Sequence, residues 1–449
     1  MTDAAPRLTR AAMLRAGTSL PVPPVRIVHL GVGGFHRAHQ AWFTARAADG
    51  EQWGIAAFTG RSADVAERLA PQDGLFTLVQ RGATADEFEV VGSIAEVHEA
   101  SSPRFAELVT APDTAVVTLT ITEAGYHLDA AGALDMTDPD IAHDVDAVRR
   151  GGATARTPIA RLTHALHLRH ESGAGPVAVV SCDNLPRNGR AVQGAVARFA
   201  AACGWDATRW PVSFVATSVD RITPRTTPAD TREVEQETGW RDEGVVVTEP
   251  FADWTMSGMF PAGRPRWESA GARFVTDIEP YERRKLLVLN GGHLVLAFGG
   301  LLRGHATVAD AMRDPACRDA LERFWAEAVV AVGGDIETDE YCRALTERFE
   351  NARIAHHLSQ IAVDTATKLR LRIVPVLHAS LAGGRDPRAA LDVLSDWAAC
   401  RRAGLIEKGR PPEELRTDLI AGLDAGLAAT IVTATEPTLH PAALAEEST

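Results

Sequence analysis

Short β-branched runs alternate with helix-like stretches through roughly the first 280 residues of the chain. The first run, Val25–Leu30, stops at a glycine, as a buried parallel strand often does. Similar runs follow at Trp53–Phe58, Ala115–Ile121, Val177–Asp183, Val212–Ser218 and Gly244–Glu249, with helix-like stretches at His36–Ala48, Ile159–His170 and Ala191–Ala202. This alternation predicts an α/β fold with a parallel, doubly wound sheet.

The character of the sequence changes after about Pro280, where Ala, Leu, Arg and Glu dominate. Amphipathic patterns there predict helices at Pro315–Val332, Asp339–Phe349 and Pro387–Ala403. We therefore expect two domains, an α/β domain at 1–279 and a mostly helical domain at 280–449. Lys408–Glu414 and the tail from Thr435 are expected to be loops.

Composition excludes several classes of function. The 449 residues include 46 Lys plus Arg and 59 Asp plus Glu, for a net charge of −13, which argues against nucleic-acid or membrane-surface binding. The five cysteines form no CxxC pair, so neither a zinc ribbon nor a disulfide framework is indicated. Met1–Pro24 lacks the apolar run of a signal peptide, and no apolar run approaches the ~20 residues of a membrane span. We expect a cytoplasmic protein without a metal site.

A glycine-rich turn follows the first predicted strand. Gly31, Gly33 and Gly34 would let the backbone approach a pyrophosphate at the N-terminus of the next helix. The GxGxxG fingerprint is imperfect because His36 replaces the third glycine, so a purely structural turn is an equal alternative. His36, Arg37 and His39 would make the helix start basic.

The end of the second strand leaves the choice of cofactor open. An acid there is typical of NAD binding and an arginine of NADP binding. The chain has both, since Arg61 comes first and Asp64 follows one turn later.

A lysine, an amide and a histidine recur at helical spacing. Lys285, Asn290 and His293 stand at i, i+5 and i+8, so in an α-helix they would span roughly 140° of arc. A partly buried amine can serve as a general base, and an amide can donate to a developing oxyanion. Gly291 and Gly292 are costly in a helix unless something approaches the backbone closely. The alternative is an ordinary amphipathic helix with a Gly-Gly kink.

A second polar segment, Ser181–Gly189, follows a predicted strand and places Asn184 where α/β sheets bind ligands. Its residues also favour turns, which is the simpler explanation, and Cys182 is expected to be buried rather than nucleophilic.

Together these segments resemble the mannitol dehydrogenase family of polyol-specific long-chain dehydrogenases. The matching stretches run in family order: Leu30–Ala41, Leu119–Tyr126, Ser181–Gly189, Val219–Pro224, Glu249–Trp254, Gly263–Gly271 and Pro280–His293, with a weaker match to about Pro375. The resemblance implies an N-terminal Rossmann-type domain that binds a dinucleotide, a helical C-terminal domain, and metal-independent, nicotinamide-dependent oxidation of a secondary alcohol.

The resemblance also assigns roles to residues. Lys285 matches the family's general base, Asn290 and Asn184 the amides at the reacting oxygen, and His293 the histidine that positions the lysine and the substrate. Asp64 matches the acid for the adenosine ribose, which favours NAD, with NADP as the alternative. The remaining matches are cofactor contacts (Gly31, Gly33, Gly34, Phe35, Arg37, Thr122, Glu123), substrate contacts (Asp220, Gln360, Lys368) and proton carriers (Glu123, Glu282).

The substrate assignment depends on the segment Gln360–Lys368. Gln360 resembles the fructuronate-reductase branch, whereas mannitol-type members have arginine there. Thr365 and Ala366 depart from the Gly-Ser of both branches, and Gly292 replaces the usual serine of NGSH. We expect a small sugar acid or polyol as partner, with D-mannonate/D-fructuronate favoured and Lys368 as the cation for the carboxylate. Mannitol/fructose, arabinitol and a non-catalytic nucleotide-binding regulator are the alternatives, and we expect a monomer or weak oligomer.

Overall fold

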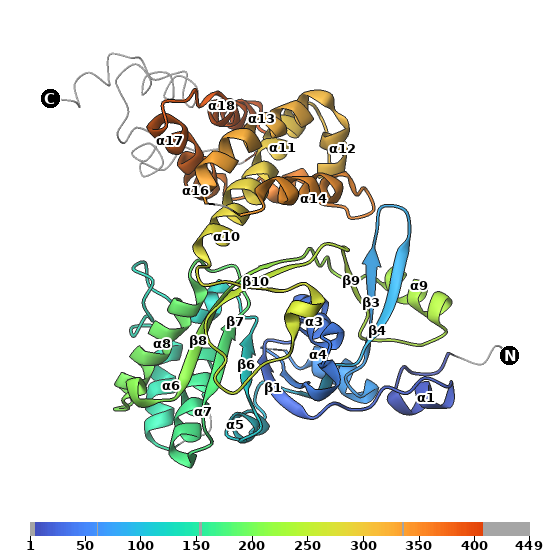
Figure 1. The fold of residues 1–449 in the computed structure, drawn as a ribbon, viewed down its shortest axis with the longest axis vertical. Coiled ribbons are helices and arrows are strands. Elements are labelled where there is room, and N and C mark those ends of the chain that lie inside the picture. Colours follow the sequence, from blue (N-terminus) through green and yellow to red (C-terminus); the bar gives the residue numbers. More distant parts are fainter. Residues whose placement is uncertain (1–4, 61, 152–154, 335, 407–449) are drawn as a thin grey trace. The chain divides into compact units, whose positions relative to one another are not determined.

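The structure is a computed structural model, and it describes residues 5–60, 62–151, 155–334 and 336–406 (Figure 1). The chain divides into two compact units, Met1–Ile278 and Glu279–Thr449. Arg61 and the two predicted C-terminal loops lie outside the described residues. A short helix, α1 (Arg10–Arg15), lies before the first predicted strand, where no element was predicted.

The first unit contains an eight-stranded sheet with the strand order β11-β10-β8-β7-β6-β1-β2-β5. Six neighbouring strands are parallel, and they are β1 (Val25–Leu30), β2 (Gly54–Phe58), β5 (Ile94–His98), β6 (Val116–Leu119), β7 (Val177–Ser181) and β8 (Val212–Asp220). This order is that of a Rossmann sheet, with its switch point between β1 and β6. The predicted doubly wound sheet is confirmed.

Two strands extend the sheet beyond the parallel part. β10 (Asp253–Ser257) pairs antiparallel with β8, and β11 (Arg273–Phe274) pairs parallel with β10. The sheet is therefore mixed at this edge, which the alternation of strands and helices does not predict.

The run at Gly244–Glu249 forms a strand in a different sheet from the one expected. β9 (Val246–Thr248) pairs with β3 (Phe76–Arg81), which forms a hairpin with β4 (Asp86–Val91). Asp242, just before β9, accepts hydrogen bonds from the backbone N–H groups of Thr77 and Gly244 and from the side chain of Gln72. The contacts with Thr77 and Gln72, which span 165 and 170 residues of sequence, hold β9 in the second sheet.

Both faces of the large sheet are buried, as a parallel sheet requires. Ile27 of β1 belongs to one apolar cluster, while Val28 and Leu30 belong to the other. The second cluster is formed with α5 (Arg104–Val109), α6 (Pro139–Arg149), α7 (Pro158–Ser172) and α8 (Asn188–Ala202), and the first with the helix after β1 and with α4 (Asp64–Leu69).

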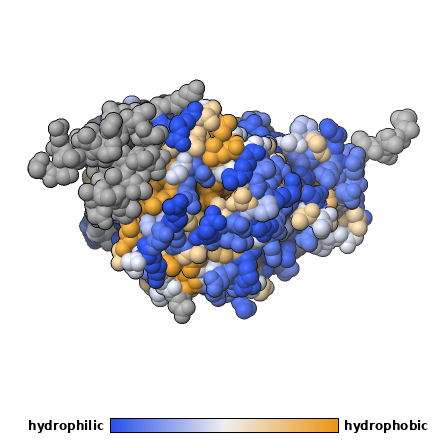
Figure 2. Space-filling model, turned by 90° about the horizontal axis from the view of Figure 1, so that it is seen from above, coloured by the Kyte–Doolittle hydropathy of each residue, from blue (hydrophilic) through white to orange (hydrophobic). Residues whose placement is uncertain are grey.

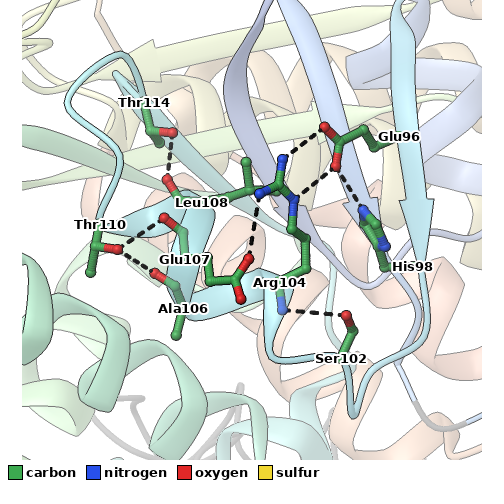
Figure 3. A network of polar contacts seen from close by, with 9 residues as sticks. All are labelled: Glu96, His98, Ser102, Arg104, Ala106, Glu107, Leu108, Thr110 and Thr114. Atoms are coloured by element: carbon green, nitrogen blue, oxygen red, sulfur yellow. Dashed lines mark hydrogen bonds and ion pairs between the residues drawn. The ribbon is translucent and has the colours of Figure 1, made fainter.

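An ion-pair network joins β5 to α5 (Figure 3). The Arg104 guanidinium donates to both carboxylate oxygens of Glu96, and His98 contacts the same carboxylate at 2.8 Å. Partial burial acts to raise the pKa of Glu96, but these hydrogen bonds outweigh it and the pKa is lowered. The network fixes the start of α5 against the edge strand.

The second unit is helical. α11 (Gly291–Leu302) is almost wholly buried and packs against α12 (Val308–Arg313), α13 (Pro315–Val332), α15 (Leu358–Ile361) and α18 (Arg388–Ala403). The remaining helices are α10 (Glu279–Arg284), α14 (Thr338–Glu350), α16 (Thr365–Arg372) and α17 (Val374–Ala382). The three predicted helices are observed within a residue or two of their expected ends.

One continuous helix, Glu279–Leu302, is long and apolar enough to cross a membrane, contrary to the expectation from apolar runs. Its apolar window is 72% buried inside the unit, which is the behaviour of a core helix. Apolar residues also reach one surface of the molecule, where Figure 2 shows them among hydrophilic residues.

Candidate functional site

The glycine-rich turn lies at the carboxyl end of β1, beside the switch point of the sheet. Gly31 has a φ of +108°, and a Cβ there would lie 2.2 Å from the carbonyl oxygen of Thr120. A Cβ on Gly33 would meet nothing closer than the Gly31 carbonyl oxygen, 3.8 Å away. The space above Gly33 is therefore open at the N-terminus of the helix that starts at Gly34. A dinucleotide pyrophosphate fits such a turn.

His36 occupies the position of the missing third glycine. Its ring is fully buried and stacks on His29 of β1 with 3.3 Å between ring centroids. The two hydroxyl groups of Thr118 and Thr120 contact the nitrogens of His29. The third glycine of the fingerprint usually allows the helix to pack closely on the strand. Here the two stacked rings fill the space between the helix and the strand.

Burial lowers the pKa of His29 to about 3 and that of His36 well below its ordinary value. The expected positive charge of His36 is therefore wrong, because this imidazole is neutral at neutral pH. The unfolded chain binds protons at these sites below about pH 6.5 and the folded chain does not.

We predict that the free energy of unfolding falls as the pH drops from 6.5 to 4, by up to ~1.4 kcal/mol per pH unit for each such histidine. Urea unfolding at several pH values measures this slope. The variant His36→Phe keeps a stacking ring and should flatten the slope relative to the unaltered protein. Equal slopes for the two proteins would contradict the assignment.

Two motif residues after the turn bind backbone carbonyl oxygens through their side chains. The Arg37 guanidinium is buried and donates to the carbonyl oxygens of Gly33 and Gly244. His39 contacts the carbonyl oxygen of Asp253 at 3.0 Å. These contacts give Arg37 a structural role, while its role toward a cofactor stays a prediction. The helix is π-helical over Arg37–Ala41, between α2 (Gly34–His36) and α3 (Trp42–Arg46).

Other predicted cofactor contacts lie at neighbouring strand ends. Asp64 is exposed and begins α4, beyond β2. Thr122 and Glu123 are exposed beyond β6, where Glu123 starts a short 3-10 helix. Phe35 is partly buried and stacks on His39.

The segment after β7 is fixed by a residue that sequence reasoning did not single out. Asn188 is fully buried, and its amide donates to the carbonyl oxygens of Ser181 and Thr217 while accepting from the Thr217 N–H. Asn188 thereby links β7 to β8, and Asn184 is exposed on the loop between β7 and α8. Cys182 is buried, as expected, and burial raises its thiol pKa well above the ordinary range.

The next strand end carries Asp220 at the buried end of β8. Arg221, its neighbour, donates to the carbonyl oxygens of Glu249 and Ala38 and to the side chain of Gln80. Burial lowers the Arg221 pKa to about 10. This arginine joins the second sheet to the helix after β1, and so fixes the backbone around Asp220.

In the second unit, Lys285–Asn290 is π-helical rather than α-helical. The Gly291 N–H donates to the carbonyl oxygen of Leu286, five residues back. Because a π-helical turn joins residues i and i+5, Lys285 and Asn290 lie about one turn apart on one side of the helix. Both are half-buried. The 140° arc expected for an α-helix is therefore wrong, and the two residues are closer in angle than expected.

The two glycines that follow serve helix packing. A Cβ on Gly291 would lie 2.8 Å from the Phe324 ring, and one on Gly292 would lie 2.8 Å from the Trp325 indole nitrogen. Trp325 donates to the carbonyl oxygen of Val288, inside the π-helical segment. The close approach inferred from the glycines is thus made by α13.

His293 lies one turn further along, buried at 8% exposure. Its ring centroid is 4.7 Å from that of Phe349 and 4.8 Å from that of His356. Among the described residues, its Nε2 atom has no hydrogen-bond partner. Burial, and then the charges of His356, Arg348 and Arg372, hold its pKa well below the ordinary value. His293 is therefore a neutral imidazole with an unused nitrogen.

Two of the predicted substrate contacts, Gln360 and Lys368, lie on short helices of this unit. Helix α16, which carries Lys368, packs against the π-helical segment. The Lys368 ammonium donates to the Ile361 carbonyl oxygen at 2.9 Å, and Gln360 is exposed on α15. Thr365 accepts a hydrogen bond from the buried indole of Trp397, so this departure from Gly-Ser joins α16 to α18. Glu282 is half-buried on α10.

One group of metal-ligand types occurs among the described residues. Atoms of His305, Asp314 and Cys317 lie within 4.8 Å of one another. The Asp314 carboxylate already contacts His305 at 2.9 Å and accepts from the Ala316 N–H, which caps α13. These contacts account for the group as a helix cap.

Comparisons with known proteins agree with this architecture. The family model described as the mannitol dehydrogenase Rossmann domain matches residues 25–269, and the mannitol dehydrogenase C-terminal domain matches residues 277–403. D-mannonate oxidoreductase of Escherichia coli K12 is 36% identical over 399 residues, covering 86% of this chain and 81% of the relative. D-arabinitol 4-dehydrogenase of Ralstonia nicotianae is 35% identical over 419 residues, covering 87% and 86%.

Among solved structures, mannitol 2-dehydrogenase of Pseudomonas fluorescens, in ternary complex with NAD and D-mannitol, is 32% identical. It matches with a TM-score of 0.75 and covers 96% of this chain and 92% of that structure. The expected fold class, a Rossmann-type domain with a mostly helical C-terminal domain, is confirmed.

Proposed function

The chain belongs to the mannitol dehydrogenase family, and on that premise we propose that it is an NAD-dependent, metal-independent dehydrogenase that interconverts D-mannonate with D-fructuronate. The family's oxidoreductases act on the hydroxyl groups of polyols and sugar acids, and a nicotinamide cofactor belongs to that chemistry. The observation that carries the proposal is the π-helical segment with Lys285 and Asn290, followed by the buried His293 with its unused nitrogen.

In this proposal Lys285 accepts the proton of the substrate hydroxyl, and Asn290 and Asn184 donate hydrogen bonds to the reacting oxygen. The neutral imidazole of His293 can donate to or accept from the substrate without adding charge. Glu123 and Glu282 carry the proton onward to solvent. Gly31, Gly33 and Gly34 would hold the pyrophosphate of a nicotinamide dinucleotide, which would supply the hydride acceptor.

A sugar acid is favoured over a polyol by Gln360, at the position where mannitol-type members have arginine, and by the similarity to D-mannonate oxidoreductase. A carboxylate needs a cation, and Lys368 on the helix that packs against Lys285–Asn290 is the proposed partner, with Asp220 and Gln360 as further substrate contacts. Mannitol/fructose and arabinitol are the second candidates, favoured by the mannitol and arabinitol relatives.

A substrate panel tests the proposal. Purified protein is assayed with NADH and fructuronate, fructose or the keto form of arabinitol, with and without EDTA. We expect fructuronate to have the highest kcat/KM and EDTA to change the rate by less than twofold. A preference for fructose would move the assignment to the second candidates. Absence of turnover with every substrate would contradict the enzymatic proposal and leave the nucleotide-binding regulator.

A further inference from the structure

The π-helical turn at Lys285–Asn290 has a carbonyl group that a side chain from another helix contacts. The Gly291 N–H donates to the carbonyl oxygens of Leu286 and Val288, five and three residues back, whereas an α-helix joins residues four apart. The Val288 carbonyl oxygen also accepts from the indole N–H of Trp325, on α13, at 2.9 Å. The indole therefore binds the turn at the point where its winding departs from that of an α-helix.

The indole reaches this carbonyl group because the residue beside it has no side chain. A Cβ on Gly292 would lie 2.8 Å from the indole nitrogen of Trp325 and 2.9 Å from Cδ1 of Leu321. The leucine methyl group can turn away, but the indole ring is rigid and buried at 6% exposure. Gly292 stands where the family resemblance has a serine, so the contact depends on a residue in which this chain departs from the family pattern.

Trp325 also lies against the ring that packs on His293. Its ring centroid is 6.1 Å from that of Phe349, and the Phe349 centroid is 4.7 Å from that of His293. Helix α13, which carries Trp325, packs against both the π-helical segment and α11. One buried side chain thus contacts the turn that carries Lys285 and, through one ring, the histidine that follows it.

The winding of the turn decides whether the lysine and the asparagine face the same way. Five residues of α-helix rotate the chain by about 500°, which leaves Lys285 and Asn290 about 140° apart. A π-helical turn joins residues i and i+5, so it brings the two side chains to one side of the helix. Such turns are rare within α-helices, and a turn of this kind therefore needs specific contacts to hold it.

We propose that Trp325 is a positioning residue that holds the π-helical turn through the Val288 carbonyl group, and thereby keeps Lys285 and Asn290 on one side of the helix. Gly292 provides the space that the indole needs. The inference rests on the proposed function for the roles of Lys285 and Asn290, whereas the winding of the turn can be measured without it.

Steady-state kinetics of two variants test the inference. Trp325→Phe removes the donor, and Gly292→Ala displaces it while favouring helix formation at that residue. The assay uses NADH and the substrate of the panel that the unaltered protein reduces fastest. We expect each variant to lower kcat by about 10- to 100-fold, which is the effect of misplacing a reacting group by about 1 Å. The KM for NADH should change by less than twofold, because no residue assigned to the cofactor lies in this segment.

A double variant and a matched control separate positioning from a general loss of packing. In Trp325→Phe/Gly292→Ala the added methyl group takes the space of the missing indole nitrogen. Its kcat should therefore match that of Trp325→Phe, whereas independent effects would multiply. The control is Trp267→Phe, which removes a buried indole that donates to the Thr44 hydroxyl at 3.0 Å in the first unit. This control should lose stability in urea and keep kcat within about threefold of the unaltered protein.

Crystal structures of the unaltered protein and of Trp325→Phe measure the winding without turnover. We expect the π-helical turn to leave Lys285–Asn290 in the variant, so that Asn290 turns away from Lys285. An unchanged turn would overturn the inference. So would a kcat within about threefold of the unaltered protein in either single variant, multiplied losses in the double variant, or an equal loss in Trp267→Phe. If the unaltered protein reduces no substrate of the panel, the proposed function fails, and the two crystal structures still decide whether Trp325 holds the turn.

Discussion

Replacing Lys285 with alanine is expected to lower kcat by about 10²- to 10⁴-fold at neutral pH, which is the usual contribution of a positioned general base. The lysine is half-buried in the π-helical segment, so truncation removes the amine without opening the core. Steady-state rates over pH 6 to 10 measure the loss, and the dissociation constant of the cofactor should change little because Lys285 is not among the predicted cofactor contacts.

The matched control is Lys285→Arg, which keeps the positive charge and much of the length. A guanidinium cannot release its proton near neutral pH, so this variant should be nearly as inactive as the alanine variant. The chain has 46 Lys plus Arg, and the lysines among them are Lys285, Lys368 and Lys408. In a chain whose basic residues are mostly arginine, a lysine at position 285 is consistent with a side chain that must lose its proton. A kcat within tenfold of the unaltered enzyme in either variant would contradict the base assignment.

Replacing Gly31 with alanine should destabilise the first unit by about 2 to 4 kcal/mol. The cost has two parts, a φ of +108° that L-residues rarely adopt and a Cβ 2.2 Å from the backbone oxygen of Thr120. Because Thr120 directly follows the last residue of β6, relief requires β1 and β6 to separate at the switch point. Urea unfolding measures the stability, and titration with NADH should show weaker binding.

Gly33→Ala is the contrasting variant. Its Cβ would meet nothing closer than 3.8 Å, so the fold should tolerate it within about 1 kcal/mol. The added methyl group would stand where the pyrophosphate is proposed to lie, so cofactor binding should weaken without loss of stability. If Gly31→Ala is as stable as Gly33→Ala, the strain argument is wrong.

The strands and helices that the sequence predicts correctly are those with a strong local pattern. Continuous β-branched runs such as Val177–Ser181 are buried on both faces and stand out from their surroundings. The hairpin strand Asp86–Val91 is half-exposed and rich in acids, so nothing local marks it as a strand. The strand at Val246–Thr248 is visible as a strand, but its sheet is decided by Asp242 and by partners about 170 residues away.

The candidate site shows the same division. The glycine turn and the Lys285–His293 segment are recognisable because their residue types are unusual at that spacing. The π-helical turn is not, because it changes the hydrogen-bond partner of each residue and leaves the composition unchanged. The roles of Arg37 and Arg221 were equally hidden, since the carbonyl oxygens that accept from them lie up to about 207 residues away.

A π-helical turn amounts to one extra residue stored in a helix, and the helix Glu279–Leu302 holds such a residue between Lys285 and Asn290. The side of the helix on which Lys285 lies relative to His293 therefore depends on the number of residues between them and on how those residues are wound. Conservative replacements within the buried run Leu287–Leu289 leave that count intact. Loss of a single residue there would let the segment wind as a regular α-helix, in which the lysine and the asparagine would stand four residues apart, still about one turn. The π-helical turn thus keeps these two residues on one side of the helix despite the extra residue between them.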